Sequence, residues 1–301
     1  MAESPTLDTG LVDRPIVAAV DGSKISYQAV MWAAVDAQLR QCPLRIVTSN
    51  AIATGYGLGS TLGEPELEWL REDGRRVLAE ASAAARDVVP GATIPVTTES
   101  TFELPIPALI ARSRVARMVV VGNRGRGAIG RAVMGSVSTA LTRHAHCPVA
   151  VVHGNAHTDP VSARRPVVVG VDGSPTSMRA VETAFEEASW RKVPLVAVHA
   201  WSDMSGYDYP PVRGWDDIRK SQDILLAESL AGFGERFPDV AVERIVVCDR
   251  PVQSLLEYAD EAQLLVVGSH GRGGFASMLL GSTSTAVSHA AECPVIVVRE
   301  P

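Results

Sequence analysis

Two loops of this chain share an unusual spacing of glycines that suits the binding of an anion. In each loop, Gly-x-x-Gly is followed after nine residues by a Gly-Ser pair. The residues are Gly122, Gly125, Gly135 and Ser136 in the first loop and Gly268, Gly271, Gly281 and Ser282 in the second. Glycine permits positive φ and lets backbone N–H groups approach a ligand without a Cβ in the way. The pattern therefore predicts two places where N–H groups surround a negative charge.

The Gly-Ser pairs are expected to begin helices whose first turns are crowded with hydroxyl groups. The first N–H groups of a helix lack partners within it and carry partial positive charge, so they can hold phosphate. Arg126 and Arg272 would add positive charge. The alternative is that the hydroxyls only cap a helix and the glycines only make a turn. Repetition of the long spacing favours a phosphate site.

Two other interpretations of the first loop are weaker. Gly125–Gly130 matches G-x-G-x-x-G, but it follows the fourth expected strand instead of the first, and the acidic residue expected about 20 positions later is missing. Gly130–Ser136 resembles a Walker loop without its lysine. A dinucleotide-binding fold and a P-loop phosphotransferase are therefore both disfavoured.

An acidic residue ends the first apolar run of each half, in the sequence Val-Asp-Gly-Ser. These residues are Asp21 and Asp172. An acid at the carboxyl end of a strand near a phosphate site could bind ribose hydroxyls or hold Mg²⁺. The competing interpretation is an N-cap of the next helix. Both roles are compatible if the carboxylate faces the ligand and Ser23 or Ser174 forms the cap.

These motifs belong to a sequence that is duplicated with a period of roughly 150 residues. Pro15–Ser23 returns as Pro166–Ser174, and Gly135–Val152 returns as Gly281–Val298. Short Val/Ile-rich runs alternate with helical segments such as Pro175–Lys192, in the order β-α-β-α-β-α-β-α-β. This alternation predicts a parallel sheet with helices on both faces. Both glycine loops follow strands, so they lie at the carboxyl edge, where such sheets bind ligands.

Length and composition narrow the class of protein. The 301 residues suggest two domains, and we expect a tail (1–14), a first domain (15–153), a linker (154–165) and a second domain (166–301). The net charge of −6 disfavours nucleic acid and anionic membranes as partners. The chain shows neither a signal peptide nor an apolar run long enough to span a bilayer, so we expect a cytoplasmic protein. The four cysteines form no C-x-x-C pair, so we expect reduced thiols and no metal site.

With these motifs the chain resembles a tandem universal stress protein of the ATP-binding kind. That family's nucleotide motif is G-2x-G-9x-G-[S/T], and both halves contain it. The resemblance covers nearly all of the chain outside the tail and the linker. It implies an α/β fold in which each half has a five-stranded parallel sheet of flavodoxin-like or adenine-nucleotide hydrolase-like arrangement. It also implies that ATP binds together with Mg²⁺.

The resemblance implies a role for individual residues as well. Asp21 and Asp172 would meet the ribose or the metal, and main chain at Ser49 and Ala200 would pair with adenine. The glycine loops would surround the ribose and phosphates. The expected contacts are Ala19, Asp21, Ser49, Val121, Gly122, Gly125, Arg126, Gly127, Ala128, Gly135, Ser136, Val137 and Ser138 in the first half, and Gly170, Asp172, Ala200, Asp203, Val267, Gly268, Gly271, Arg272, Gly273, Gly274, Gly281, Ser282, Thr283 and Ser284 in the second.

The expected function is regulatory ATP binding in a stress response, with slow ATP hydrolysis at most. Two alternatives stay open: a slow nucleotide-hydrolysing or nucleotide-transferring enzyme, and an interaction module whose nucleotide is structural. We expect no catalytic residues, because the halves share no paired carboxylates and the loops contain no lysine. Expected partners are ATP, an unidentified protein and a second copy of the chain. Within one chain, the two halves are expected to pair along Val149–Val152 and Val295–Val298.

Overall fold

The computed structural model describes residues 14–51, 63–125, 134–154, 161–200, 215–248, 250–271 and 280–299. The strands are β1 (Ile16–Ala19), β2 (Leu44–Ser49), β3 (Val96–Thr101), β4 (Met118–Gly122), β5 (Val149–Val152), β6 (Val167–Gly170), β7 (Leu195–Ala200), β8 (Val242–Val247), β9 (Leu264–Gly268) and β10 (Val295–Val298). The helices are α2 (Lys24–Leu39), α3 (Glu64–Val88), α4 (Pro105–Ser113), α5 (Ser136–His144), the short 3-10 helix η1 (Ser162–Arg164), α6 (Pro175–Arg191), α7 (Trp215–Arg236), α8 (Pro251–Ala259) and α9 (Ser282–Ala290). Both halves thus show the predicted alternation.

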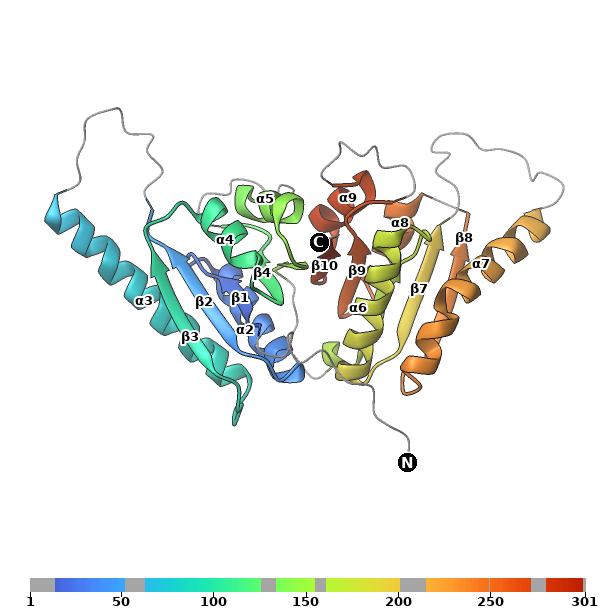
Figure 1. The fold of residues 1–301 in the computed structure, drawn as a ribbon, viewed down its shortest axis with the longest axis horizontal. Helices are drawn as coiled ribbons and strands as arrows, with labels where there is room; N and C mark the ends of the chain where they lie inside the picture. The colour runs from blue at the N-terminus through green and yellow to red at the C-terminus, as the bar shows by residue number, and fades with distance from the viewer. Residues whose placement is uncertain are drawn as a thin grey trace.

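All ten strands form one sheet, in the order β3-β2-β1-β4-β5-β10-β9-β6-β7-β8. Within each half every strand pair is parallel. The halves meet where β5 and β10 pair antiparallel, with Ala150 opposite Ile296. Figure 1 shows the two halves side by side, and the pairing of β5 with β10 joins them. The expected pairing of Val149–Val152 with Val295–Val298 is confirmed.

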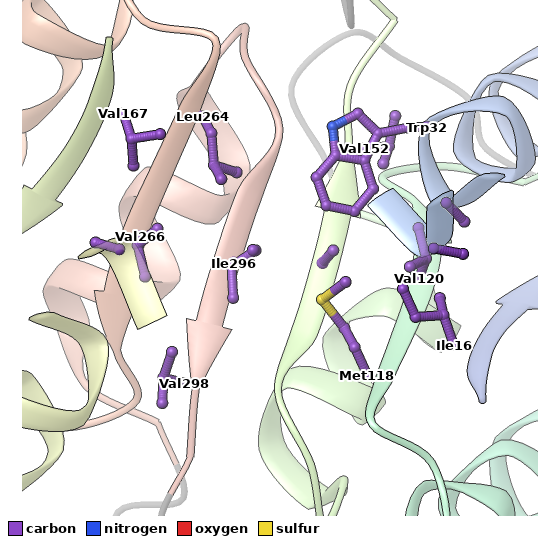
Figure 2. Packing of buried hydrophobic residues seen from close by; sticks show 14 of the residues in the cluster. Ile16, Trp32, Met118, Val120, Val152, Val167, Leu264, Val266, Ile296 and Val298 are labelled. Carbon is purple, nitrogen blue, oxygen red and sulfur yellow. The ribbon is translucent and has the colours of Figure 1, made fainter. Parts of the chain in front are cut away.

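The strands are apolar because both faces of the sheet are covered. On the face that α2, α3, α6 and α7 cover, buried residues from both halves form one continuous cluster. Figure 2 shows part of this cluster, including Met118 and Val152 in the first half and Ile296 in the second. On the opposite face, each half has a separate cluster under its own helices, α4 with α5 and α8 with α9. The main core therefore spans the junction between the halves.

A buried group of four charged side chains also joins the halves. We call it the interface quartet: Asp36 from α2 with Arg40, the C-cap of that helix, and their counterparts Glu187 and Arg191 from α6. Arg40 pairs with both carboxylates, and Arg191 does the same, with its nitrogens 2.7 Å from Asp36 and 2.8 Å from Glu187. Both carboxylate side chains are completely buried. Each buried charge thus has two opposite charges as partners, which burial of an ion requires.

The helix α6 shows how the quartet alters a simple amphipathic pattern. Helical spacing places the apolar residues Val181, Ala184, Phe185 and Ala188 on one stripe of α6, and all four are buried. Met178, which the same spacing places on the stripe, is only partly buried, while the charged Glu187 is fully buried. The difference arises because α6 packs against the sheet and against the other half at the same time.

Candidate functional site

A cavity of about 750 Å³ opens at the carboxyl edge of the first half's sheet. It lies between β1 and β4, with β2 beside them. At this point the strand order changes sides: β2 and β3 are added on one side of β1, and β4 and β5 on the other. Parallel α/β sheets bind their ligands at this position. The volume is in the range typical of pockets for small molecules.

Every candidate residue of the first half that the structure describes lines this cavity. These residues are Ala19, Asp21, Ser49, Val121, Gly122, Gly125, Gly135, Ser136, Val137 and Ser138. Three strand ends and the start of α5 bring them together. Arg126, Gly127 and Ala128 lie outside the described residues.

The turn after β1 separates the two interpretations of Asp21. Gly22 has φ of 81°, a conformation that glycine adopts without strain. Ser23 is the N-cap of α2, and its Oγ accepts a hydrogen bond from the Ser26 N–H. Asp21 is not the cap: its Oδ1 accepts from the Ser23 N–H at 2.9 Å. The carboxylate is therefore held by a short local turn at the edge of the cavity, and Ser23 supplies the cap.

Asp21 also faces the glycine loop. A Cβ on Gly125 would stand 2.5 Å from Asp21 Oδ2. Any side chain at position 125 would therefore displace the carboxylate. The glycine at this position keeps the acid and the loop in contact at the mouth of the cavity.

The start of α5 does not fit the simple capping interpretation of the hydroxyl run. Gly135 is the N-cap, and no side chain among the described residues caps the helix. The Ser138 hydroxyl instead donates to the carbonyl groups of Gly135 and Asn123, at 3.0 Å and 3.3 Å. The hydroxyl thus binds helix and strand end together, and the first turn of α5 faces the cavity without a side-chain cap. An anion is the ligand that such a helix end favours.

Glycine occupies positions 122 and 135 of the loop for different physical reasons. A Cβ on Gly122 would stand 2.6 Å from Ile25 Cγ2, so this glycine is required by packing of β4 against α2. A Cβ on Gly135 would meet its closest neighbour, the Asn123 carbonyl oxygen, at an ordinary 3.5 Å. The φ of Gly135 is −65°, which any residue adopts. Nothing among the described protein atoms requires glycine at 135, which is the pattern expected where a ligand takes the space.

Two helices contribute cavity residues that sequence reasoning missed. From α3 come Trp69, Leu70, Asp73, Gly74 and Val77, and from α4 come Pro105, Ala108 and Leu109. Thr101, at the end of β3, also lines the cavity. Trp69 is 63% exposed at the rim. The position of α4 could have been inferred, because Pro105 follows β3 at the same edge of the sheet. Which residues of α3 line the cavity depends on how this helix is rotated against the sheet. That rotation is set by tertiary packing and cannot be read from the local sequence.

The second half repeats the geometry of the acidic turn, of the glycine beside the acid and of the helix start. Gly173 has φ of 79°, Ser174 caps α6, and Asp172 Oδ1 accepts from the Ser174 N–H at 2.9 Å. A Cβ on Gly271 would collide with the Asp172 carboxylate. Gly281 is the N-cap of α9, again without a side-chain cap among the described residues.

The other candidates of the second half lie at the corresponding strand and helix ends. Ser284 donates from Oγ to the Gly268 carbonyl at 2.6 Å, and Ser282 and Thr283 form the first turn of α9. Gly170, Ala200 and Val267 lie at the ends of β6, β7 and β9. Asp203, Arg272, Gly273 and Gly274 lie outside the described residues.

Other chemically active side chains are explained by packing. His199 is buried, with Nδ1 2.6 Å from the Val171 carbonyl and Nε2 3.0 Å from Gln222 Oε1. Burial raises the pKa of both Cys147 and Cys293 to about 12. Such thiols are poor nucleophiles and poor metal ligands. Within the described ranges, no three His, Cys, Asp or Glu residues form a metal-binding group, and no helix is long and apolar enough to cross a membrane.

The fold and the cavity define a tandem α/β protein with a candidate ligand cavity at the carboxyl edge of a parallel sheet. The universal stress protein family model matches residues 14–153 and 163–299. One universal stress protein of Mycobacterium tuberculosis is 45% identical over 289 residues, which cover 95% of this chain and 97% of the relative. A second is 44% identical over 312 residues and covers 95% of each chain. A universal stress protein structure from Archaeoglobus fulgidus has a TM-score of 0.68 at 19% identity, covering 95% of this chain and 98% of that one. This chain belongs to the universal stress protein family.

Proposed function

We propose that this chain binds one ATP in the first half and one in the second, and that the bound nucleotide regulates a stress response. The observation that carries the proposal is the start of α5, which faces the cavity without a side-chain cap, beside the acid of the β1 turn. Backbone N–H groups of a helix N-terminus suit phosphate, and a carboxylate at a strand end suits ribose hydroxyls. These two groups lie on one cavity, as a nucleotide requires.

The rest of the cavity suits the base. Its inner wall contains apolar side chains from several elements, including Val47, Val77, Leu109 and Val121. Ligand sites combine such apolar walls with a few polar groups that fix orientation. At the rim, the exposed indole of Trp69 offers a flat apolar surface for an aromatic ring. Adenine would thus lie between α3, α4 and the strand ends, with the phosphates toward α5.

The residues present also fit Mg²⁺ as a companion of the phosphates. Mg²⁺ is usually held by one or two carboxylates together with substrate phosphates and water. Asp21 in the first half and Asp172 in the second would supply the carboxylate. When bound, the ion would neutralise phosphate charge. The protein holds each carboxylate in place through a backbone N–H group: Ser23 donates to Asp21, and Ser174 donates to Asp172.

Regulation is the favoured role because the described cavity residues offer little for fast chemistry. The acid beside the loop has a local structural partner, and no lysine is among the described residues that line the cavity. We therefore expect slow ATP hydrolysis at most. The homodimer of whole chains, the unidentified protein partner and the cytoplasmic location stay predictions.

Identification of the ligand carried through purification tests the proposal. The chain is purified without added nucleotide, denatured, and its released small molecules are analysed by mass spectrometry. We expect ATP or ADP at close to stoichiometric amounts, and turnover of added Mg²⁺-ATP over hours at most. Absence of any nucleotide, together with no binding of ATP by stripped and refolded protein, would contradict the proposal.

A further inference from the structure

The helices whose N-termini face the proposed phosphates, α5 and α9, are each held at the other end by the opposite half. Arg299, directly after β10, donates from Nη1 to the Thr142 carbonyl in the last turn of α5, at 2.6 Å. His153, directly after β5, has Nε2 3.0 Å from the Ser288 carbonyl in the last turn of α9. In the duplicated sequence His153 corresponds to Arg299, and Thr142 corresponds to Ser288. The same contact is therefore made twice, in opposite directions.

The chemistry of the two contacts is well defined. A carbonyl oxygen can only accept, so Nε2 of His153 carries the proton and donates. His153 is 4% exposed, and both Thr142 and Ser288 are fully buried. Arg299 is half-buried and always charged. The first half thus contributes a neutral donor to α9, and the second half contributes a cation to α5.

A third contact reaches the other end of α5. Met134, which lines the first cavity, has its backbone nitrogen 3.5 Å from Nδ1 of His289 in α9. Met134 directly precedes Gly135, the N-cap of α5. The second half therefore contacts α5 at both ends, and one of these contacts adjoins the cavity. Figure 1 shows α5 and α9 next to each other above the central strands.

The physics of a short helix links its two ends. The last carbonyl groups of a helix lack partners within it and carry partial negative charge, so a donor or cation there stabilises the helix. Both helices have nine residues, a length of about 13 Å. Over this length a helix moves as a rigid body. A shift of its C-terminal anchor therefore redirects the N–H groups at its N-terminus.

We propose that each half positions the phosphate-binding helix of the other half: Arg299 is a positioning residue for the first ligand site, and His153 is one for the second. This inference rests on the proposed function, because the N–H groups being positioned are those assigned to phosphate. It adds that neither site is complete without the pairing of β5 with β10.

Calorimetric titration with Mg²⁺-ATP tests the proposal on chains in which only one site is open. Gly281→Val leaves the first site, and Gly135→Val leaves the second. Adding Arg299→Ala should weaken the first site about three- to tenfold and leave the second within twofold. Adding His153→Ala should do the reverse. Arg299→Lys, which keeps a cationic donor, should restore most of the first site's affinity.

In the expected result, each substitution weakens ATP binding only at the site of the opposite half. A merely structural role of Arg299 or His153 would not produce this pattern. Should Arg299→Ala weaken both sites equally, or only the site of its own half, the proposal is overturned. Unchanged affinity at both sites would overturn it as well, and would leave the proposed function standing. If the two parent variants and the unaltered chain all fail to bind ATP, the proposed function fails, and this inference with it. His153→Gln, which keeps a neutral donor at this buried position, provides the second variant and should keep the second site within threefold.

Discussion

The carboxylate of Asp21 and the backbone of Gly125 are in direct contact, so that a Cβ on Gly125 would stand 2.5 Å from Asp21 Oδ2. Asp172 and Gly271 repeat this relationship in the second half. An acid fixed by its own turn and a glycine that leaves space for it therefore form one structural unit. A bulky residue at 125 would disturb the acid and the loop together, so other variants test the two parts separately.

Asp21→Asn tests the charge of the acid without disturbing its turn. The asparagine oxygen can still accept from the Ser23 N–H, as Asp21 Oδ1 does at 2.9 Å. We expect native circular dichroism and about tenfold weaker binding of Mg²⁺-ATP at the first site, because a charged acceptor is lost. Calorimetry with and without Mg²⁺ measures the effect, and Asp172→Asn is the matched variant for the second site. Unchanged affinity in both variants would show that the acids serve only the turns.

Glu187→Gln tests the interface quartet. Removal of one charge leaves Arg40 and Arg191 buried with a single carboxylate between them. Breaking a buried ion pair in this way costs about 3–5 kcal/mol. We expect a loss of that order in urea unfolding. Glu182→Gln on the same helix removes an exposed pair with Arg236 and should cost less than about 1 kcal/mol. Equal effects of the two substitutions would contradict the role of the quartet.

His153 predicts a pH dependence of stability with a definite sign. Burial lowers the pKa of His153 below its ordinary value of 6.5. The unfolded chain therefore binds the proton of this histidine more readily than the folded chain does. The contribution of neutral His153 to the free energy of unfolding is thus complete above pH 6.5 and is lost as the pH falls below it. His153→Gln keeps a donor but does not titrate. Between pH 7.5 and 5.5 it should lose less stability than the unaltered chain. An identical pH profile in urea unfolding would contradict this assignment.

Thiol reactivity distinguishes packing cysteines from functional ones. Cys42, Cys147 and Cys293 are buried, and Cys248 is exposed. Burial also raises the pKa of the three buried thiols. At pH 8 a disulfide reagent should therefore titrate about one thiol in the native chain and about four after denaturation. Rapid reaction of Cys147 or Cys293 in the native chain, mapped by mass spectrometry, would show a reactive site that packing does not explain.

Local sequence signals predicted the strand ends, the glycine loops and the helix starts. The Asp-Gly-Ser turns were predictable because Gly22 and Gly173 take positive φ and Ser23 and Ser174 cap the following helices. The pairing of β5 with β10 was predictable because each half was expected to have an exposed edge strand of similar, Val-rich composition at this position. Each of these features depends on residues close together in the sequence or on the repeat itself.

Features that depend on packing between distant helices were not predictable. Trp69 and Asp73 line the cavity because of how α3 is rotated against the sheet, which no spacing in α3 reveals. Asp36 and Glu187 look like ordinary surface acids within their own helices. They are buried only because α2 and α6 meet across the junction of the halves. Gly122 matches the ligand motif and lines the cavity, and its close approach to Ile25 shows that packing is by itself a sufficient reason for glycine at this position.

The most direct test of the account is the number of ATP molecules bound per chain, measured by calorimetry on ligand-stripped protein with Mg²⁺. We predict about two for the unaltered chain and about one for either Gly135→Val or Gly281→Val. The double variant should bind none, because each side chain enters one phosphate space while the backbone stays in an ordinary conformation. Gly154→Val is the control: a Cβ there meets nothing within 4 Å, and it should bind about two. A double variant that folds and still binds two ATP would contradict the assignment of α5 and α9 to phosphate.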